Sequence, residues 1–121
     1  MRYKILAVMT LVSTLVCSHA GAVEYTSEYL ESGRGLLEDC EDAGSNFNSG
    51  YCLGFIHGMC SMHDYAARKY SARLYCAPDE VTNGQVRRII IKFLKDHPNR
   101  LHETDLILAV DALREAFPCK K

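Results

Sequence analysis

The sequence predicts an all-α protein, a small four-helix domain braced by disulfides. In four segments the apolar residues recur at three- and four-residue steps, the spacing that places them on one face of a helix. No segment alternates convincingly between apolar and polar residues, as a half-buried strand would. Five of the six cysteines follow residue 20, and small exported domains commonly cross-link such cysteines.

The start of the chain has the order of features that defines an export signal. Two basic residues, an apolar run and a small-residue cleavage motif follow one another: Arg2 and Lys4, Ile5 to Cys17, and Ser18-His19-Ala20. The apolar run is too short to span a bilayer as a stable helix. A lipid anchor on the cysteine is disfavoured because Val16 stands where a small residue is needed. We therefore expect residues 1–20 to be a cleaved signal peptide and residues 21–121 to form one exported domain, with no membrane attachment.

The first two predicted helices cover about residues 27–41 and 49–70, with a break of small and polar residues between them. Gly50, Gly54 and Gly58 fall four residues apart on the second helix. Each glycine costs a helix roughly 1 kcal/mol relative to alanine, so a compensating gain is expected. We expect another backbone to approach closely here, either within the domain or across a dimer.

The third predicted helix begins after a capping box, in which Thr82 and Gln85 satisfy each other's free amide groups. An amphipathic stripe follows on the helix itself: Val86, Ile89, Ile90, Phe93 and Leu94. His97-Pro98 ends this helix, because proline disfavours helical geometry in the residue before it. A fourth helix is expected over about residues 101–117, with one inward face formed by Leu106, Ala109, Val110, Leu113 and Phe117.

Five cysteines allow several pairings, and the sequence alone does not choose among them. Helix geometry favours two of these pairings. Cys40 ends the first helix and Cys52 opens the second, so a short hairpin brings them together. Cys76 precedes the third helix and Cys119 follows the fourth, so they share one end if those helices are antiparallel. Cys60 is left over and is expected to pack as a small apolar residue.

Charge and motifs exclude several function classes. Without Arg2 and Lys4, twelve basic residues face fifteen acidic ones, a net charge near −3 that argues against a general nucleic-acid binder. Residues 24–42 are strongly acidic, whereas Arg87, Arg88, Lys92 and Lys95 form a basic cluster; these are either solvated helix faces or a surface that steers a basic partner. No phosphate loop, serine hydrolase elbow or zinc protease motif is present. A binding protein is therefore favoured over an enzyme.

Four residues of the second helix, His57, Cys60, His63 and Asp64, suggest a metal site or a cysteine nucleophile with a histidine base. Their spacing drifts around the helix, and the second ligand pair that structural zinc sites bring from elsewhere is missing. A nucleophile would also need a base held within hydrogen-bond reach. We therefore expect no metal, no cofactor and no catalytic residue.

The exposed segment from Asp96 to His102 is predicted to be a rigid turn between the third and fourth helices. One interpretation is a tight connection with a purely structural role. The other is a protruding loop that fits a partner's cleft, because an arginine and an apolar tip are good anchors at interfaces.

Several short motifs together resemble the Rap/Tai family of type VI secretion amidase immunity proteins. In order they are Cys52-Leu53-Gly54-Phe55-Ile56-His57-Gly58, Cys76-Ala77-Pro78, Thr82 to Gln85, His97-Pro98, His102, Ala112-Leu113 and Ala116-Phe117-Pro118-Cys119. Each motif is weak alone, but their order and spacing are fairly specific, and they extend over residues 36–119. Cys60 departs from the pattern, which more usually has a plain apolar residue there.

The resemblance implies a small helical periplasmic protein, often a homodimer, that neutralises a peptidoglycan-cleaving amidase delivered by a neighbouring cell. In the family, a loop of the immunity protein occludes the toxin's catalytic cleft. Carried onto this chain, the partner-binding residues are His97, Pro98, Asn99 and Arg100, with the acidic first helix as a second contact. The competing hypotheses are a periplasmic acid-stress chaperone and a metal-binding protein.

Overall fold

A computed structural model describes residues 31–42 and 44–120 of the chain. Its helices are α2 (Gly33–Glu41), α3 (Asn46–Tyr70), α4 (Asn83–Asp96), the short 3-10 helix η1 (Pro98–Arg100) and α5 (Asp105–Ala116). Within these residues the only extended pairing is one isolated bridge between Ser32 and Thr104. The predicted all-α class is therefore confirmed for this part of the chain. The predicted signal peptide lies outside it, and none of the described helices has the length and apolarity to span a bilayer.

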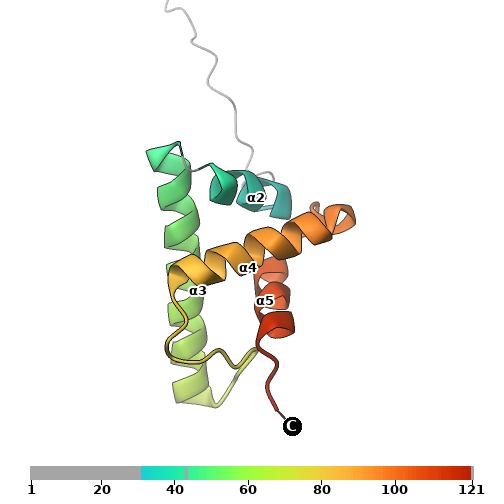
Figure 1. Cartoon of the computed structure of the whole chain (residues 1–121). Coiled ribbons are helices and arrows are strands. Elements are labelled where there is room, and N and C mark those ends of the chain that lie inside the picture. Colours follow the sequence, from blue (N-terminus) through green and yellow to red (C-terminus); the bar gives the residue numbers. More distant parts are fainter. Residues whose placement is uncertain (1–30, 43, 121) are drawn as a thin grey trace, which may run out of the picture.

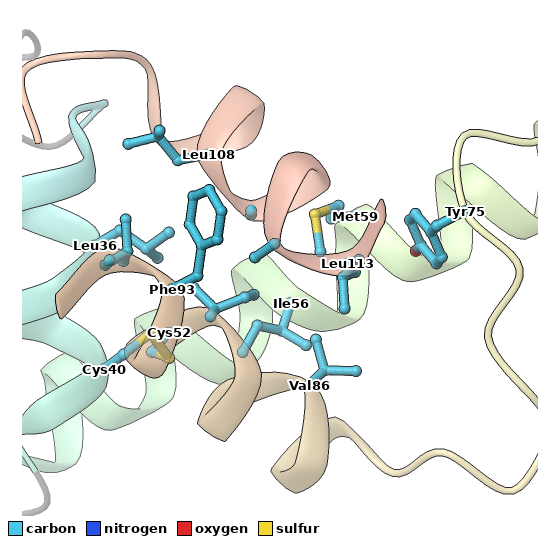
Figure 2. Packing of buried hydrophobic residues seen from close by; sticks show 14 residues of the cluster. Leu36, Cys40, Cys52, Ile56, Met59, Tyr75, Val86, Phe93, Leu108 and Leu113 are labelled. Carbon is cyan, nitrogen blue, oxygen red and sulfur yellow. A yellow bond between two sulfur atoms is a disulfide. The ribbon is translucent and has the colours of Figure 1, made fainter. Parts of the chain in front are cut away.

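The long helix α3 runs the length of the molecule, and α2 and α4 both extend away from it to one side, α2 next to its first turns (Figure 1). Helix α5 lies behind α4 and packs against both α4 and α2. Side chains from all four helices meet in one core, which Figure 2 shows from close by. Its largest fully buried members are Leu36, Ile56, Ile90, Leu94, Leu108, Leu113, Cys40 and Cys52.

Helix starts follow the capping residues in the sequence. The predicted capping box is present, since the Gln85 amide donates to the Thr82 hydroxyl and the Thr82 amide donates to the Gln85 side chain. The Ser45 side chain caps α3, which begins at Asn46, three residues earlier than expected. Helix α4 ends at Asp96, and His97, which precedes Pro98, is its C-cap. The predicted stop at His97-Pro98 is therefore confirmed.

The first and fourth helices begin later than the sequence predicts. Ser32 is the N-cap of α2, and its side chain accepts a hydrogen bond from the Gly35 amide, so residues 31 and 32 are not helical. Residues 101–104 form a turn before α5 starts at Asp105. Both differences have one cause: residues 31–34 pair with residues 101–105 through backbone hydrogen bonds instead of extending the two helices.

Both disulfides that helix geometry favours are formed. Cys40 is bonded to Cys52 and ties α2 to α3, while Cys76 is bonded to Cys119 and ties the segment before α4 to the chain end after α5. The Cys76 amide also donates to the Phe117 carbonyl at 2.8 Å. Loops closed by bonds of these sequence separations stabilise small domains by roughly 3–4 kcal/mol each on a chain-entropy argument.

The glycines of α3 do not pack within the subunit. A Cβ atom placed at Gly50, Gly54 or Gly58 would meet nothing within 4 Å, so the expected close approach of a backbone inside the domain is wrong. Gly33 is the glycine that packs closely, chiefly against a side chain of α5. A Cβ atom there would lie 2.2 Å from Leu108 Cδ1 and 3.5 Å from the Leu101 Cα.

A glycine in a filled site and a glycine in an open site should respond in opposite ways to replacement by alanine. Gly33→Ala overpacks a filled site and should lower the free energy of unfolding by roughly 1–3 kcal/mol. Gly84→Ala is the matched control because the new methyl group makes only ordinary contacts, at 3.8 Å or more, near the start of α4. It should be neutral or stabilise by up to about 1 kcal/mol. Denaturant unfolding of both variants measures the difference, and equal effects would show that the Gly33 contact does not restrict the fold.

Candidate partner-binding surface

The connection between α4 and α5, residues 97–104, contains the four predicted partner-binding residues and is here called the α4–α5 turn. Its first residue is folded back onto its own helix. The His97 ring stacks on Phe93 with 4.1 Å between ring centroids, and its Nδ1 donates to the Phe93 carbonyl at 2.8 Å. His97 therefore closes the end of α4 and is half-buried.

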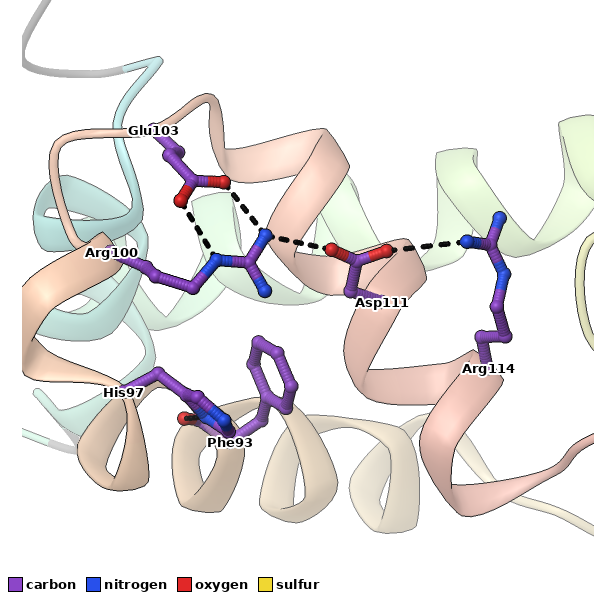
Figure 3. Close-up of polar contacts among 6 residues, drawn as sticks. All are labelled: Phe93, His97, Arg100, Glu103, Asp111 and Arg114. Atoms are coloured by element: carbon purple, nitrogen blue, oxygen red, sulfur yellow. Dashed lines mark hydrogen bonds and ion pairs between the residues drawn. The ribbon is translucent and has the colours of Figure 1, made fainter.

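The Arg100 side chain points inward across the turn, as Figure 3 shows. Its Nε and one terminal nitrogen donate to the two Glu103 carboxylate oxygens at 2.8 and 2.7 Å. The same terminal nitrogen reaches Asp111 Oδ2 of α5 at 2.8 Å, and the guanidinium carbon lies 5.7 Å from the centre of the Phe93 ring. The two carboxylates raise the pKa of Arg100 and keep it charged. Arg100 therefore braces the turn from behind.

Among the four predicted residues, only two face solvent fully. Pro98, Asn99 and His102 are exposed, and η1 lies at the far end of α4 (Figure 1). The segment behind them is held by α2, since the Arg34 amide donates to the Leu101 carbonyl at 3.0 Å and the Gly33 amide donates to the Glu103 carbonyl at 2.9 Å. The structure thus divides the four predicted residues into an exposed pair, Pro98 and Asn99, and two residues that support it.

The acidic and basic clusters meet where α2 ends beside α4. Glu41 of α2 pairs with Lys95 of α4, and Arg87 of α4 donates to the Cys40 carbonyl at the end of α2. Asp42 accepts hydrogen bonds from the Gly44 and Ser45 amides, which shapes the connection to α3. Glu41 and Asp42 therefore serve contacts within the domain, which weakens the interpretation of this part of the helix as an open acidic surface.

Two carboxyl groups are buried beside α3. Asp39 of α2 and Asp105 of α5 have only 7% and 6% of their surface exposed. Burial raises the pKa of both, helped by the charges of Glu38 and Asp42 at Asp39 and of Glu31 at Asp105. The hydroxyl of Tyr51 on α3 also has a raised pKa, through burial and then through the charge of Asp105. The folded state is therefore more stable when these groups are protonated and neutral than when they are charged.

Two of the four residues considered for metal or nucleophile chemistry, Cys60 and His63, contact the segment that follows α3. His63 Nε2 accepts from the Leu74 amide at 3.2 Å, and its ring stacks on Tyr75 at 3.8 Å. Cys60 is a half-buried free thiol whose pKa is raised by burial, and the Tyr75 hydroxyl donates to its sulfur. Among the described residues, no three His, Cys, Asp or Glu side chains are grouped as metal ligands. Cys60 and His63 instead hold the segment around Tyr75 against α3.

An apolar groove of about 530 Å³, here called the α3 groove, is a feature that the sequence interpretation missed. Its main lining residues are Phe55, Met62, Ala66, Leu74, Leu106 and Val110. Leu106 was expected to face the core but is 48% exposed, because Leu108 and Ala112 take the inward positions on α5. Leu106 lies on nearly the same side of α5 as the buried Leu113, but it is in the first turn of the helix, where it borders the open groove rather than the core.

Comparison with protein-family models matches residues 32–119 to Rap1a immunity proteins. The chain belongs to this family. The matched segment includes every described helix and both disulfides, and the resemblance seen in the sequence motifs is thereby confirmed. No curated protein and no solved structure matched the chain. Membership of this family implies binding of a cognate effector.

The buried carboxyl groups of this immunity protein predict an unusual pH dependence. Because the folded-state pKa of Asp39 is raised, its contribution to stability is fully present below its unfolded pKa and is lost as pH rises through the folded pKa. Asp39→Asn should therefore stabilise the protein at neutral pH, by on the order of 1 kcal/mol. The advantage should shrink as the pH is lowered towards the ordinary carboxyl range. Thermal unfolding across this range measures it, and an Asn variant less stable than the parent at neutral pH would contradict the assignment.

Proposed function

We propose that this immunity protein blocks a peptidoglycan amidase delivered by type VI secretion, by inserting the α4–α5 turn into the catalytic cleft. The observation that carries the proposal is the construction of this turn. Arg100 and α2 hold it from behind, and Pro98 and Asn99 project into solvent. A loop ordered before it binds loses little conformational entropy in the complex, so more of the contact energy is retained as affinity.

The protein is proposed to act as a stoichiometric inhibitor rather than as an enzyme. Burial raises the pKa of the one free thiol in the described chain, at Cys60, and a protonated thiol is a poor nucleophile. His63 is engaged with Leu74 and Tyr75, so it is not arranged as a base for that thiol.

We place the protein in the periplasm as a homodimer, exported by a cleavable signal at residues 1–20. Two disulfides support an oxidising compartment, because they persist there and are rare where thiols are kept reduced. The cell wall that an amidase cleaves lies in the same compartment, so inhibitor and toxin would meet there.

An acid-stress chaperone remains the second candidate, because the α3 groove is the kind of apolar surface that such a protein uses. The raised pKa values of Asp39 and Asp105 act against acid opening, since protonation of these groups favours the folded state. Binding of an apolar dye at neutral and mildly acidic pH separates the two: a chaperone would bind more dye as the pH falls, whereas the inhibitor would not.

The decisive experiment replaces the turn residues and measures inhibition of a candidate amidase, such as one encoded beside this protein. Replacing Asn99 and Arg100 together with alanine should weaken amidase binding by at least about tenfold, because the exposed contact and its brace are both lost. Helix content should stay unchanged, since both residues lie outside α4 and α5. Calorimetry and residual amidase activity measure the binding.

Two further variants distinguish direct contact with the amidase from support of the α4–α5 turn. Asn99→Ala removes an exposed side chain only, and Asp111→Asn removes the charge of the α5 partner of Arg100 without changing the tip. Both should weaken binding, Asn99→Ala through its lost contact and Asp111→Asn through a less ordered turn. Unaltered amidase inhibition by the double variant would rule out this turn as the inhibitory element.

A further inference from the structure

Helix α3 turns an apolar face towards solvent, here called the α3 outer face. Its members recur at three- and four-residue steps, which places them on one side of the helix: Phe47, Tyr51, Gly54, Gly58, Met62 and Tyr65. The large side chains are well exposed, with 76% of Phe47, 64% of Met62 and 53% of Tyr65 accessible. The buried residues Cys52, Ile56 and Met59 lie on the opposite side of α3, so no core contact requires this face to be apolar.

The outer face is also free of charge. From Asn46 to His63 the helix contains no Asp, Glu, Lys or Arg, and the first charged side chain is Asp64. A long uncharged stretch on an exposed helix is unusual for a solvated surface, and depletion of charge is the compositional mark of an interface core.

Holes and protruding side chains both occur on this face. Gly54 and Gly58 leave open space where side chains would stand. Near the other end of α3, the α3 groove opens between Met62, Leu74 and Leu106. Phe47 protrudes at the start of the helix, about four turns away from the groove along the axis. A surface with both a protruding group and a matching recess can bind a copy of itself.

We propose that the outer faces of two copies pack against each other with their α3 helices antiparallel, crossing near Ile56. In this register Gly54 of one copy lies beside Gly58 of the other, so the two backbones approach closely. Phe47 of each copy then lies level with Tyr65 of the other, beside the groove, and fills it. The proposal rests on the homodimer of the proposed function and specifies its interface.

The available area is consistent with a stable pair. A free side chain of this size exposes roughly 200 Å², so Phe47, Met62 and Tyr65 together present on the order of 400 Å² at their observed exposures. Tyr51, Leu74, Leu106 and the glycine backbone extend this towards the ~800 Å² that each partner buries in a standard interface. In an isologous pair each contact also occurs twice, once from each copy, so every recess that one copy supplies is filled by the other.

The test introduces a charge where the subunit has space for it. Gly58→Glu should leave the fold intact, because nothing lies within 4 Å of a Cβ atom there, and it puts like charges at the helix crossing. The chain from residue 21 onward should be dimeric by light scattering, and this variant should raise its dimer dissociation constant at least about 100-fold. Gln85→Glu is the matched control, since it adds the same charge on α4 and preserves the capping box. Circular dichroism checks that both variants fold, and Gly58→Ala, a milder change, should weaken the dimer less.

A cross-linking experiment tests the register. Mixing Gly54→Cys and Gly58→Cys proteins should give disulfide-linked dimers in preference to either protein alone, because those two positions are opposite each other only in the antiparallel arrangement.

The outcomes separate the interface from the proposals on which it rests. A monomeric parent chain would overturn both the homodimer and this interface, while amidase inhibition through the α4–α5 turn would be unaffected. A dimer that survives Gly58→Glu would overturn the interface and leave the homodimer standing. A chain that dimerises only after residues 21–30 are removed would show that this segment, rather than a second copy, covers the face.

Discussion

The pairing of residues 31–34 with residues 101–105 is the constraint on which the rest of the structure depends. It joins segments about seventy residues apart through three backbone hydrogen bonds: Gly33 to Glu103, Arg34 to Leu101, and Asp105 to Glu31. Gly33 also leaves room for the Leu108 side chain of α5 beside this pairing, since a methyl group there would collide with it. The pairing sets where α2 begins, where α5 begins and how the α4–α5 turn is held.

The same constraint changes the meaning of the residues in the turn. An arginine at the tip of an exposed loop suggests an anchor for a partner, yet Arg100 is directed back to Glu103 and Asp111. Bidentate pairing of a guanidinium with a carboxylate fixes geometry as well as charge. Arg100 therefore links the end of η1 to the residues before α5 and to α5 itself. In the proposed inhibitor, the specificity of the turn comes from its shape, and its side-chain contacts are few.

Local signals in the sequence predicted much of this fold, because they depend on neighbours along the chain. The capping box at Thr82 and Gln85, the stop at Pro98 and the stripe from Val86 to Leu94 all correspond to structure. The failures concern contacts between distant residues. Ser32 forms a bridge to Thr104 instead of joining a helix, and Leu106, in the first turn of α5, borders the α3 groove rather than the core. Neither the Arg100–Asp111 pair nor the α3 groove leaves a periodic signal, so neither could be anticipated.

Helix α3 shows how stability and surface are divided in this molecule. Its three exposed glycines cost the helix roughly 3 kcal/mol relative to alanine, and no contact within the subunit compensates for them. The Cys40–Cys52 bond near the start of α3 and the packing of Ile56 and Met59 offset that cost. Helix propensity is thus low on the side of α3 that faces away from the core, while the disulfides help to maintain the fold. Such an arrangement is favourable for a protein whose outer surface, rather than an internal site, carries its function.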